Sequence, residues 1–169
     1  MNRKYTVYFF ICIIVCLLSK SIVAQTTINN GACNVGISIP DNNCVDVSIN
    51  VVASGNSLGQ DVFLSEARLI MTHDWRADVE MTLTTPNDEA SLLLIDRRGG
   101  TGDNWGMPDN GNCAQPMVLS DDGCAMEAIN AANKSSEAVG RYIPEQPFAD
   151  LYQSPAIDPN GVWNLSVIF

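Results

Sequence analysis

Histidine and basic residues are scarce in this chain, and several motifs of catalytic and metal sites are missing. The 169 residues contain one histidine, His73, and 9 lysines and arginines against 19 aspartates and glutamates. No HExxH and no CxxC spacing occurs, so a zinc site would lack its usual ligands. A Ser-His-Asp triad would have to use His73, which follows an apolar segment and is interpreted as structural. The acidic excess repels phosphate backbones and disfavours nucleic-acid binding.

Long apolar runs are also missing, apart from one near the amino terminus. Residues 7–18 are almost wholly apolar, follow the basic pair Arg3 and Lys4, and precede the small residue Ala24. This three-part pattern is typical of a secretory signal peptide. The run is shorter than the roughly 20 residues that a membrane helix needs, although an uncleaved anchor is the alternative. We therefore expect a signal peptide over residues 1–24 and a secreted or cell-surface protein with no membrane segment after cleavage.

The mature chain is expected to be more acidic still. Cleavage removes Arg3, Lys4 and Lys20, which leaves 6 of the 9 basic residues against all 19 acidic ones, a formal charge of -13. Such a surface suits cations and basic partners. About 145 residues remain, enough for one domain with a hydrophobic core.

Four cysteines remain after signal cleavage, and an even number in an exported chain predicts two disulfides. Three pairings are open. The favoured pairing closes two short local loops, and each bond would stabilise the fold by roughly 2 to 4 kcal/mol. It joins Cys33 with Cys44 and Cys113 with Cys124.

Alternating apolar residues predict a series of short strands. The clearest are residues 44–52, 78–86, 90–96 and 161–169, each bounded by turn residues. In the last, Trp163, Leu165, Val167 and Phe169 share one face, and Val79, Met81 and Leu83 do so in 78–86. Residues 61–73 are apolar on both faces and predict a central strand, whereas 124–133 predict a short helix. This pattern indicates an all-β sandwich.

Several motifs follow one another in a recognisable order. A His-x-Trp pair, His73 and Trp75, precedes "DVEMTL", "TTPND" and "GGTGDNWG"; further on come "VLSDDG", "GRYIPEQPFADL" and "DPNGVWNLSV". In this order they resemble the P domain, or P/Homo B domain, of the proprotein convertases and related secreted bacterial proteins. The match covers about residues 38–169. Ala77 stands where the family often has glycine, and the cysteine pairs look like local additions.

The resemblance implies a jelly-roll-like β-sandwich of the galactose-binding-like kind. It divides the chain into a signal peptide (1–24), a lead-in (25–37) and a P/Homo B domain (38–169). The family normally has another strand after the Trp-x-Leu strand, so the domain is expected to be truncated at its carboxyl end. An unpaired sheet edge is then expected beside the strand that ends at Phe169, which would favour aggregation.

In the family, this domain supports the folding, stability or calcium dependence of a subtilisin-like serine protease. The resemblance therefore implies a non-catalytic accessory or interaction module whose partner is a protease catalytic domain or another extracellular protein. Two alternatives stay open. One is that the chain is part of a serine-type endopeptidase, so that its status as an enzyme is undecided. The other is that it is a surface adhesion module that binds carbohydrate. No aromatic platform for a sugar can be assigned from the sequence.

The glycine loop in "LLLIDRRGGTGDNWG", residues 92–106, is the main candidate site. It is not a Walker loop, because no Lys-Ser or Lys-Thr follows the glycines. Carboxylate and amide oxygens are ligands that calcium prefers, and a solvated turn is the alternative. The predicted calcium ligands are Asp103, Asn104, Asp121 and Asp122, with Asp78 as a weaker candidate. Arg97 and Arg98 could instead neutralise these carboxylates.

Overall fold

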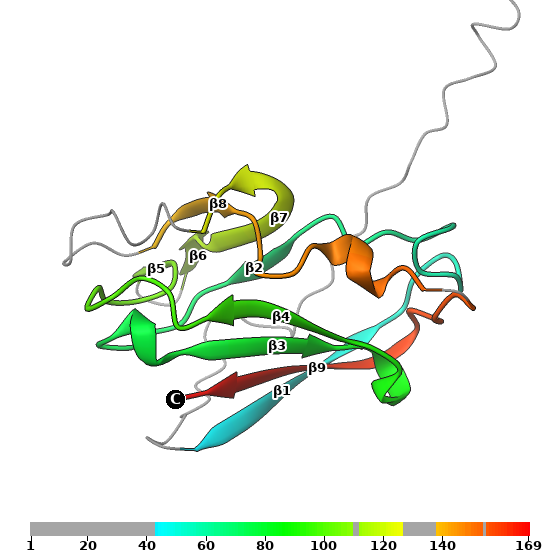
Figure 1. Ribbon diagram of the computed structural model, residues 1–169, viewed down its shortest axis with the longest axis horizontal. Helices are drawn as coiled ribbons and strands as arrows, with labels where there is room; N and C mark the ends of the chain where they lie inside the picture. Colours follow the sequence, from blue (N-terminus) through cyan, green and yellow to red (C-terminus); the bar gives the residue numbers. More distant parts are fainter. Residues whose placement is uncertain (1–42, 110–111, 127–137, 154) are drawn as a thin grey trace, which may run out of the picture.

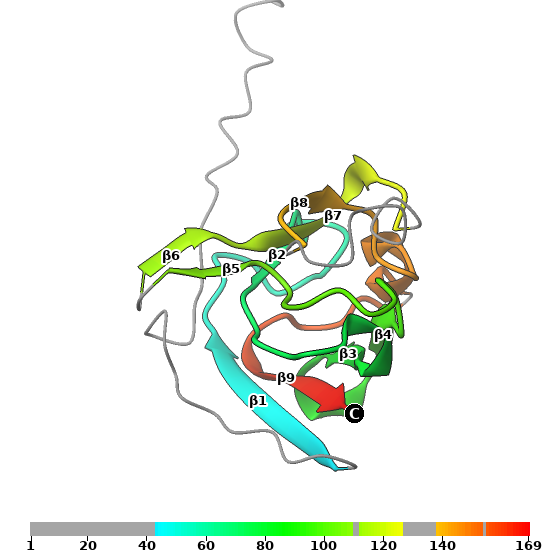
Figure 2. The same ribbon diagram turned by 90° about the vertical axis from the view of Figure 1, so that its left-hand side faces the viewer.

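The protein is built almost entirely from strands arranged in two layers. The computed structural model describes residues 43–109, 112–126, 138–153 and 155–169. One layer is a four-stranded sheet with the order β1-β9-β3-β4, and the other is a three-stranded sheet with the order β2-β7-β8 (Figures 1 and 2). A two-stranded hairpin, β5-β6, adjoins the smaller sheet (Figure 2). The all-β prediction is confirmed.

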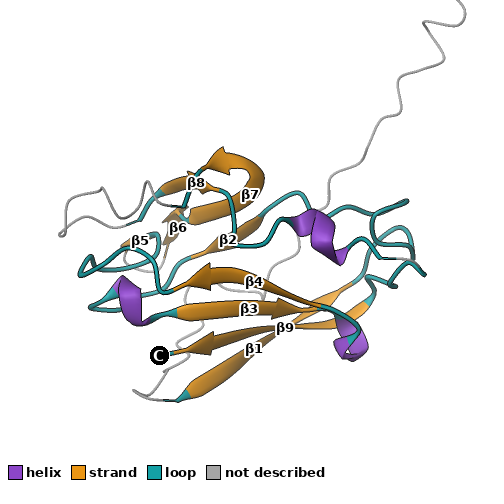
Figure 3. Ribbon diagram, in the orientation of Figure 1, coloured by secondary structure: helices purple, strands orange, loops and turns teal. Residues whose placement is uncertain are grey.

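The helical content of the described residues is limited to three short 3-10 turns, two of which flank β3 while the third lies in the connection between β8 and β9 (Figure 3). The strands are β1 (Cys44–Val51), β2 (Ala67–Leu69), β3 (Glu80–Thr84), β4 (Ser91–Asp96), β5 (Met107–Asp109), β6 (Asn112–Gln115), β7 (Met117–Cys124), β8 (Gly140–Tyr142) and β9 (Gly161–Ile168). The turns are η1 (Arg76–Asp78), η2 (Pro86–Asp88) and η3 (Phe148–Leu151).

The larger sheet follows the alternation of its sequence. In β1 every second residue is partly buried and the others are exposed, which is the period of a strand with one face on the core. In β3, Met81 and Leu83 are buried and their neighbours are not, as the sequence predicts. Trp163 and Val167 of β9 are buried on the same side of the sheet, and Leu165 and Phe169 pack against the core.

Strand β9 lies inside the larger sheet. Residues 161–168 pair antiparallel with β1 on one side, and residues 164–168 pair antiparallel with β3 on the other. The expectation of an unpaired edge beside this strand is therefore wrong. From Asn164 to Ile168, β9 has a hydrogen-bonded neighbour on each side, as a central strand does.

The outer edge of β4 is covered by the segment that leads into η3. The N–H groups of Glu145 and Gln146 donate to the carbonyls of Leu94 and Leu93, at 3.1 and 3.0 Å. The side-chain oxygen of Gln146 accepts from the N–H of Leu93 at 2.7 Å. Because these groups take the positions of a neighbouring strand, β4 does not present a bare edge.

A single hydrophobic core fills the space between the two sheets. Its fully or almost fully buried members come from both layers and from the loops that join them. Burying one such large apolar side chain contributes roughly 1.5 to 3 kcal/mol. The largest are Trp105, Phe148, Leu58, Met81, Leu92, Leu94, Ile95, Met117, Leu119 and Leu151.

Two local predictions differ from the structure. Residues 61–73 form only the three-residue strand β2, because most of the segment packs on the core as irregular chain. A segment apolar on both faces does not by itself specify a strand. Cys124, expected to open a short helix, is the last residue of β7, and most of the remaining helix prediction lies outside the described residues.

Several further predictions fall outside the described residues. These are the signal peptide (1–24), the lead-in (25–37) and Cys33. Across the described ranges, no helix has the length and apolar character that a membrane span requires.

Candidate functional site

The glycine loop between β4 and β5 folds over the 3-10 turn η1. The N–H of Arg76 donates to the carbonyl of Gly102 at 2.9 Å, and the N–H of Ala77 donates to the carbonyl of Gly100 at 3.1 Å. Arg76 is fully buried, and its guanidinium lies 5.9 Å from the centre of the Trp105 ring. This arrangement makes the loop a cover for a buried arginine.

Glycine is favoured at two positions of this loop, for separate steric reasons. A Cβ on Gly102 would stand 1.9 Å from Nη2 of Arg76, so a side chain at this position conflicts with the buried guanidinium. Gly106 has a φ of 76° and its Cβ would lie 2.9 Å from the carbonyl oxygen of Leu69. Both the left-handed backbone and the close approach of another strand favour glycine there.

Arg98, one of the two arginines that could neutralise the acidic residues of the loop, pairs with Glu145. Its Nε and Nη2 donate to the two carboxylate oxygens of Glu145, at 2.6 and 2.8 Å. This two-bonded geometry is the strong form of an arginine–carboxylate pair. It fastens the start of the loop to the segment that covers β4.

Asn104, one of the predicted calcium ligands, has a structural role. Its side-chain oxygen accepts from the N–H of His73 at 3.1 Å, and its own N–H donates to the carbonyl of His73 at 2.9 Å. Its φ of 54° is a left-handed conformation that asparagine tolerates better than most residues. The residue therefore fixes the backbone of His73 to the glycine loop.

The predicted acidic pair of β7 also makes specific contacts. Asp121 accepts a hydrogen bond from the N–H of Phe148, the first residue of η3, at 2.9 Å. Asp122 accepts from the hydroxyl of Ser120 and from Nη1 of Arg141, the latter at 3.0 Å. These two bonds, the Ser120 bond first, lower the pKa of Asp122 below its ordinary value of 3.8.

The five predicted calcium ligands are distributed over different parts of the fold. Asp78 ends η1, Asp103 is exposed in the glycine loop, and Asp121 contacts η3. Within the described ranges, no three histidine, cysteine, aspartate or glutamate side chains form a group that could hold a metal ion. Calcium binding at residues 99–106 stays a prediction, without support from these side chains.

The predicted disulfides also remain predictions. Cys44 and Cys124 are both exposed, and neither is bonded to another cysteine of the described residues. Their predicted partners are Cys33 and the side chain of Cys113, and both lie outside what the structure describes.

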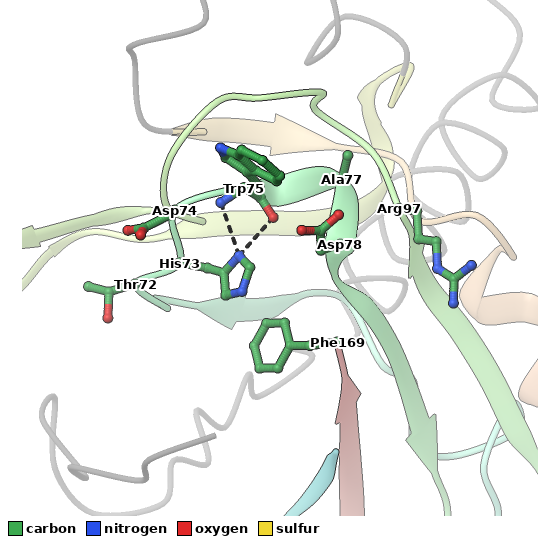
Figure 4. A pocket seen from close by; sticks show the side chains of 8 residues that line it. All are labelled: Thr72, His73, Asp74, Trp75, Ala77, Asp78, Arg97 and Phe169. Carbon is green, nitrogen blue, oxygen red and sulfur yellow. Dashed lines mark hydrogen bonds between the residues drawn. The ribbon is translucent and has the colours of Figure 1, made fainter. Parts of the chain in front are cut away.

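A solvent-open depression lies at the end of the sandwich where β9 finishes. Figure 4 shows the side chains of Trp75 and Asp78 on one side of the His73 ring and Phe169 on its other side. The rings of His73 and Phe169 are stacked, with centroids 4.2 Å apart and planes 7° from parallel. The complete lining is Thr72, His73, Asp74, Trp75, Ala77, Asp78, Arg97 and Phe169.

The His73 ring is held by the backbone of Trp75. Its Nδ1 lies 2.7 Å from the carbonyl oxygen of Trp75 and 3.1 Å from the backbone nitrogen of the same residue. No serine or carboxylate of the described chain hydrogen-bonds to this ring. The arrangement agrees with a structural histidine.

Trp75 is the feature of this depression that the sequence does not reveal. Its side chain is 57% exposed, although the other two tryptophans, Trp105 and Trp163, are buried at 0% and 6%. The motif "HDW" marks the position but does not say which side of the chain the ring lies on. The exposure of the indole is therefore seen only in the folded structure.

Comparison with protein-family models, with curated proteins and with solved structures gives no match for this chain.

Proposed function

We propose that this chain is a non-catalytic, exported module of the P/Homo B kind with a jelly-roll-like fold. In this proposal it works as an accessory or interaction domain for a subtilisin-like serine protease or another extracellular protein. The order of motifs along the sequence is the basis of the proposal. The two-layered strand architecture is compatible with it.

The observation that most favours a non-catalytic role is the engagement of His73. A triad histidine needs one ring nitrogen close to the nucleophile and the other oriented by a carboxylate. In this chain Nδ1 is occupied by the backbone of Trp75, and one face of the ring is covered by Phe169. His73 is the only histidine in the sequence, so no second one can take the role.

The test is a hydrolysis assay on the purified protein. Wild type and His73→Ala are incubated with fluorogenic peptide and ester substrates and with a fluorophosphonate probe that labels active serines. We expect neither turnover nor labelling above the buffer control in either protein. Turnover by the wild type that disappears in His73→Ala would overturn the proposal in favour of an endopeptidase.

A further inference from the structure

The depression presents one large, exposed aromatic side chain, that of Trp75. The indole of Trp75 leaves more than half of its surface in water, and large apolar groups in concave, partly polar surroundings are typical of binding sites. Phe63 is similarly exposed at 59%, but it packs edge-on against Tyr152 and does not line the depression. The two aromatic residues therefore offer a matched pair for comparison.

The backbone that presents Trp75 is held in place on several sides. The backbone N–H and the carbonyl of Trp75 both contact Nδ1 of His73. The His73 ring stacks on Phe169, and the His73 backbone is hydrogen-bonded to Asn104. A side chain presented by a fixed scaffold loses less entropy on binding than one on a free loop. The depression is therefore prepared before a ligand arrives.

The polar groups that line the depression include hydrogen-bond donors and acceptors. Asp74 and Asp78 can only accept hydrogen bonds when ionised, Arg97 can only donate them, and the hydroxyl of Thr72 can do both. A fully charged ligand of either sign would meet a like charge among these groups. A neutral ligand with several hydroxyls can donate to the carboxylates and accept from the guanidinium at once.

We propose that this depression binds a neutral saccharide. One face of Trp75 packs against the C–H face of a sugar ring, because the negative face of an aromatic ring attracts weakly positive hydrogens. Asp74 and Asp78 accept hydrogen bonds from ring hydroxyls, and Arg97 donates to a hydroxyl oxygen. The depression is open, so it suits part of a longer glycan. This activity goes beyond the accessory role proposed above and does not depend on a protease partner.

The competing occupant is a basic peptide. A lysine or arginine side chain could lie over Trp75 as a cation and pair with the two aspartates. Arg97, which lines the same depression, opposes a second cation there. The saccharide fits the mixed charges of the depression better. The experiment below therefore includes a basic peptide as the competing ligand.

The experiment measures protection of Trp75 from a quencher. Trp105 and Trp163 are buried, so acrylamide quenching of tryptophan fluorescence reports chiefly on Trp75. The probes are cellohexaose, laminarihexaose, mannohexaose and maltohexaose at millimolar concentration, with hexalysine as the cationic arm. Calorimetry of the same mixtures gives the dissociation constants. The variants are Trp75→Ala, Trp75→Phe, Asp78→Asn and the control Phe63→Ala.

We expect at least one hexasaccharide to bind and to reduce quenching in the wild type. Trp75→Ala should weaken this binding by at least about tenfold, since buried aromatic contacts dominate binding energies. Trp75→Phe should retain part of the affinity, Asp78→Asn should reduce it, and Phe63→Ala should match the wild type. Because Trp75 is exposed, none of its substitutions should unfold the domain, which circular dichroism checks.

Three results would overturn the proposal. One is that no saccharide of the panel binds. Another is that a saccharide binds equally well to Trp75→Ala, which would place the site elsewhere. The third is that hexalysine alone binds and protects Trp75, which would assign the depression to a cationic peptide. None of these results bears on hydrolysis, so the proposed accessory function stands or falls separately.

Discussion

Replacing Gly102 with alanine should destabilise the fold, because the new methyl group would fall on the buried guanidinium of Arg76. An ideal Cβ at this position stands 1.9 Å from Nη2 and 2.6 Å from Cζ of the arginine. Arg76 is fully buried, so its end group cannot move aside into water. Overpacking of a filled interior costs about 1 to 3 kcal/mol, and we expect a loss in this range. Urea denaturation measures it as a lower midpoint with an unchanged slope.

Gly100 in the same loop provides the control. Its φ is +55°, but no atom lies within 4 Å of the position that a Cβ would take, so Gly100→Ala should cost only the roughly 1 kcal/mol of a left-handed backbone. A second control repeats Gly102→Ala in an Arg76→Ala background, where the methyl group has room. The loss of stability caused by Gly102→Ala should then be smaller, because the effects of substitutions at contacting residues are not additive. Equal penalties in both backgrounds would refute the reasoning.

Three other outcomes are expected. Trp163→Ala should cost about 3 to 5 kcal/mol in urea denaturation, because a buried indole is lost from the central strand; a loss below about 1 kcal/mol would contradict its place in the core. Asp122→Asn should be less stable than the wild type at pH 7, because Ser120 and Arg141 lower the pKa of Asp122 below 3.8 in the folded state. That contribution is complete above pH 3.8 and disappears as the pH falls through the lower folded value, so the two urea midpoints should converge in acid; a constant difference would be evidence against it. If the glycine loop binds calcium, saturating calcium should raise the melting midpoint of the wild type and leave that of Asp103→Ala lower; identical responses would reject Asp103 as a ligand.

The strands of the larger sheet could be predicted because one of their faces is buried. The alternation of Val45, Val47 and Ile49 in β1, and of Met81 and Leu83 in β3, specifies both the strand and the side that faces the core. Residues 61–73 lack this alternation, and apolar residues on both sides fit an irregular chain packed on a core as well as a strand. Periodicity alone could not decide between them.

The contacts of the acidic segment of β7 could not be predicted from the sequence for a different reason. Asp121 and Asp122 belong to a strand that begins with the buried residues Met117 and Leu119. Their carboxylates are used by η3 and by Arg141, contacts between segments far apart in the sequence. Such contacts depend on tertiary structure and leave no local pattern.

The candidate binding site could not be predicted from the sequence for the same reason. The sequence marks His73 and Trp75 as a pair, and an aromatic residue beside aspartates is compatible with burial or exposure. The depression also depends on Phe169, which is 94 residues beyond Trp75 in the chain and stacks on His73. The sequence shows which residue types are present, but it does not show how they are arranged in space.

The accessory role is tested most directly by the thermal melting of a protease in the presence of this protein. The protease is the subtilisin-like catalytic domain encoded nearest to the chain in its genome, inactivated by replacing its catalytic serine with alanine. A protein that binds only the folded catalytic domain raises its melting midpoint by mass action. We expect a melting midpoint that rises with the concentration of this chain and then reaches a plateau. The accessory role would be contradicted if the melting midpoint of the protease domain stayed constant. The concentration of this chain should then be well above the concentrations that both proteins reach in the medium.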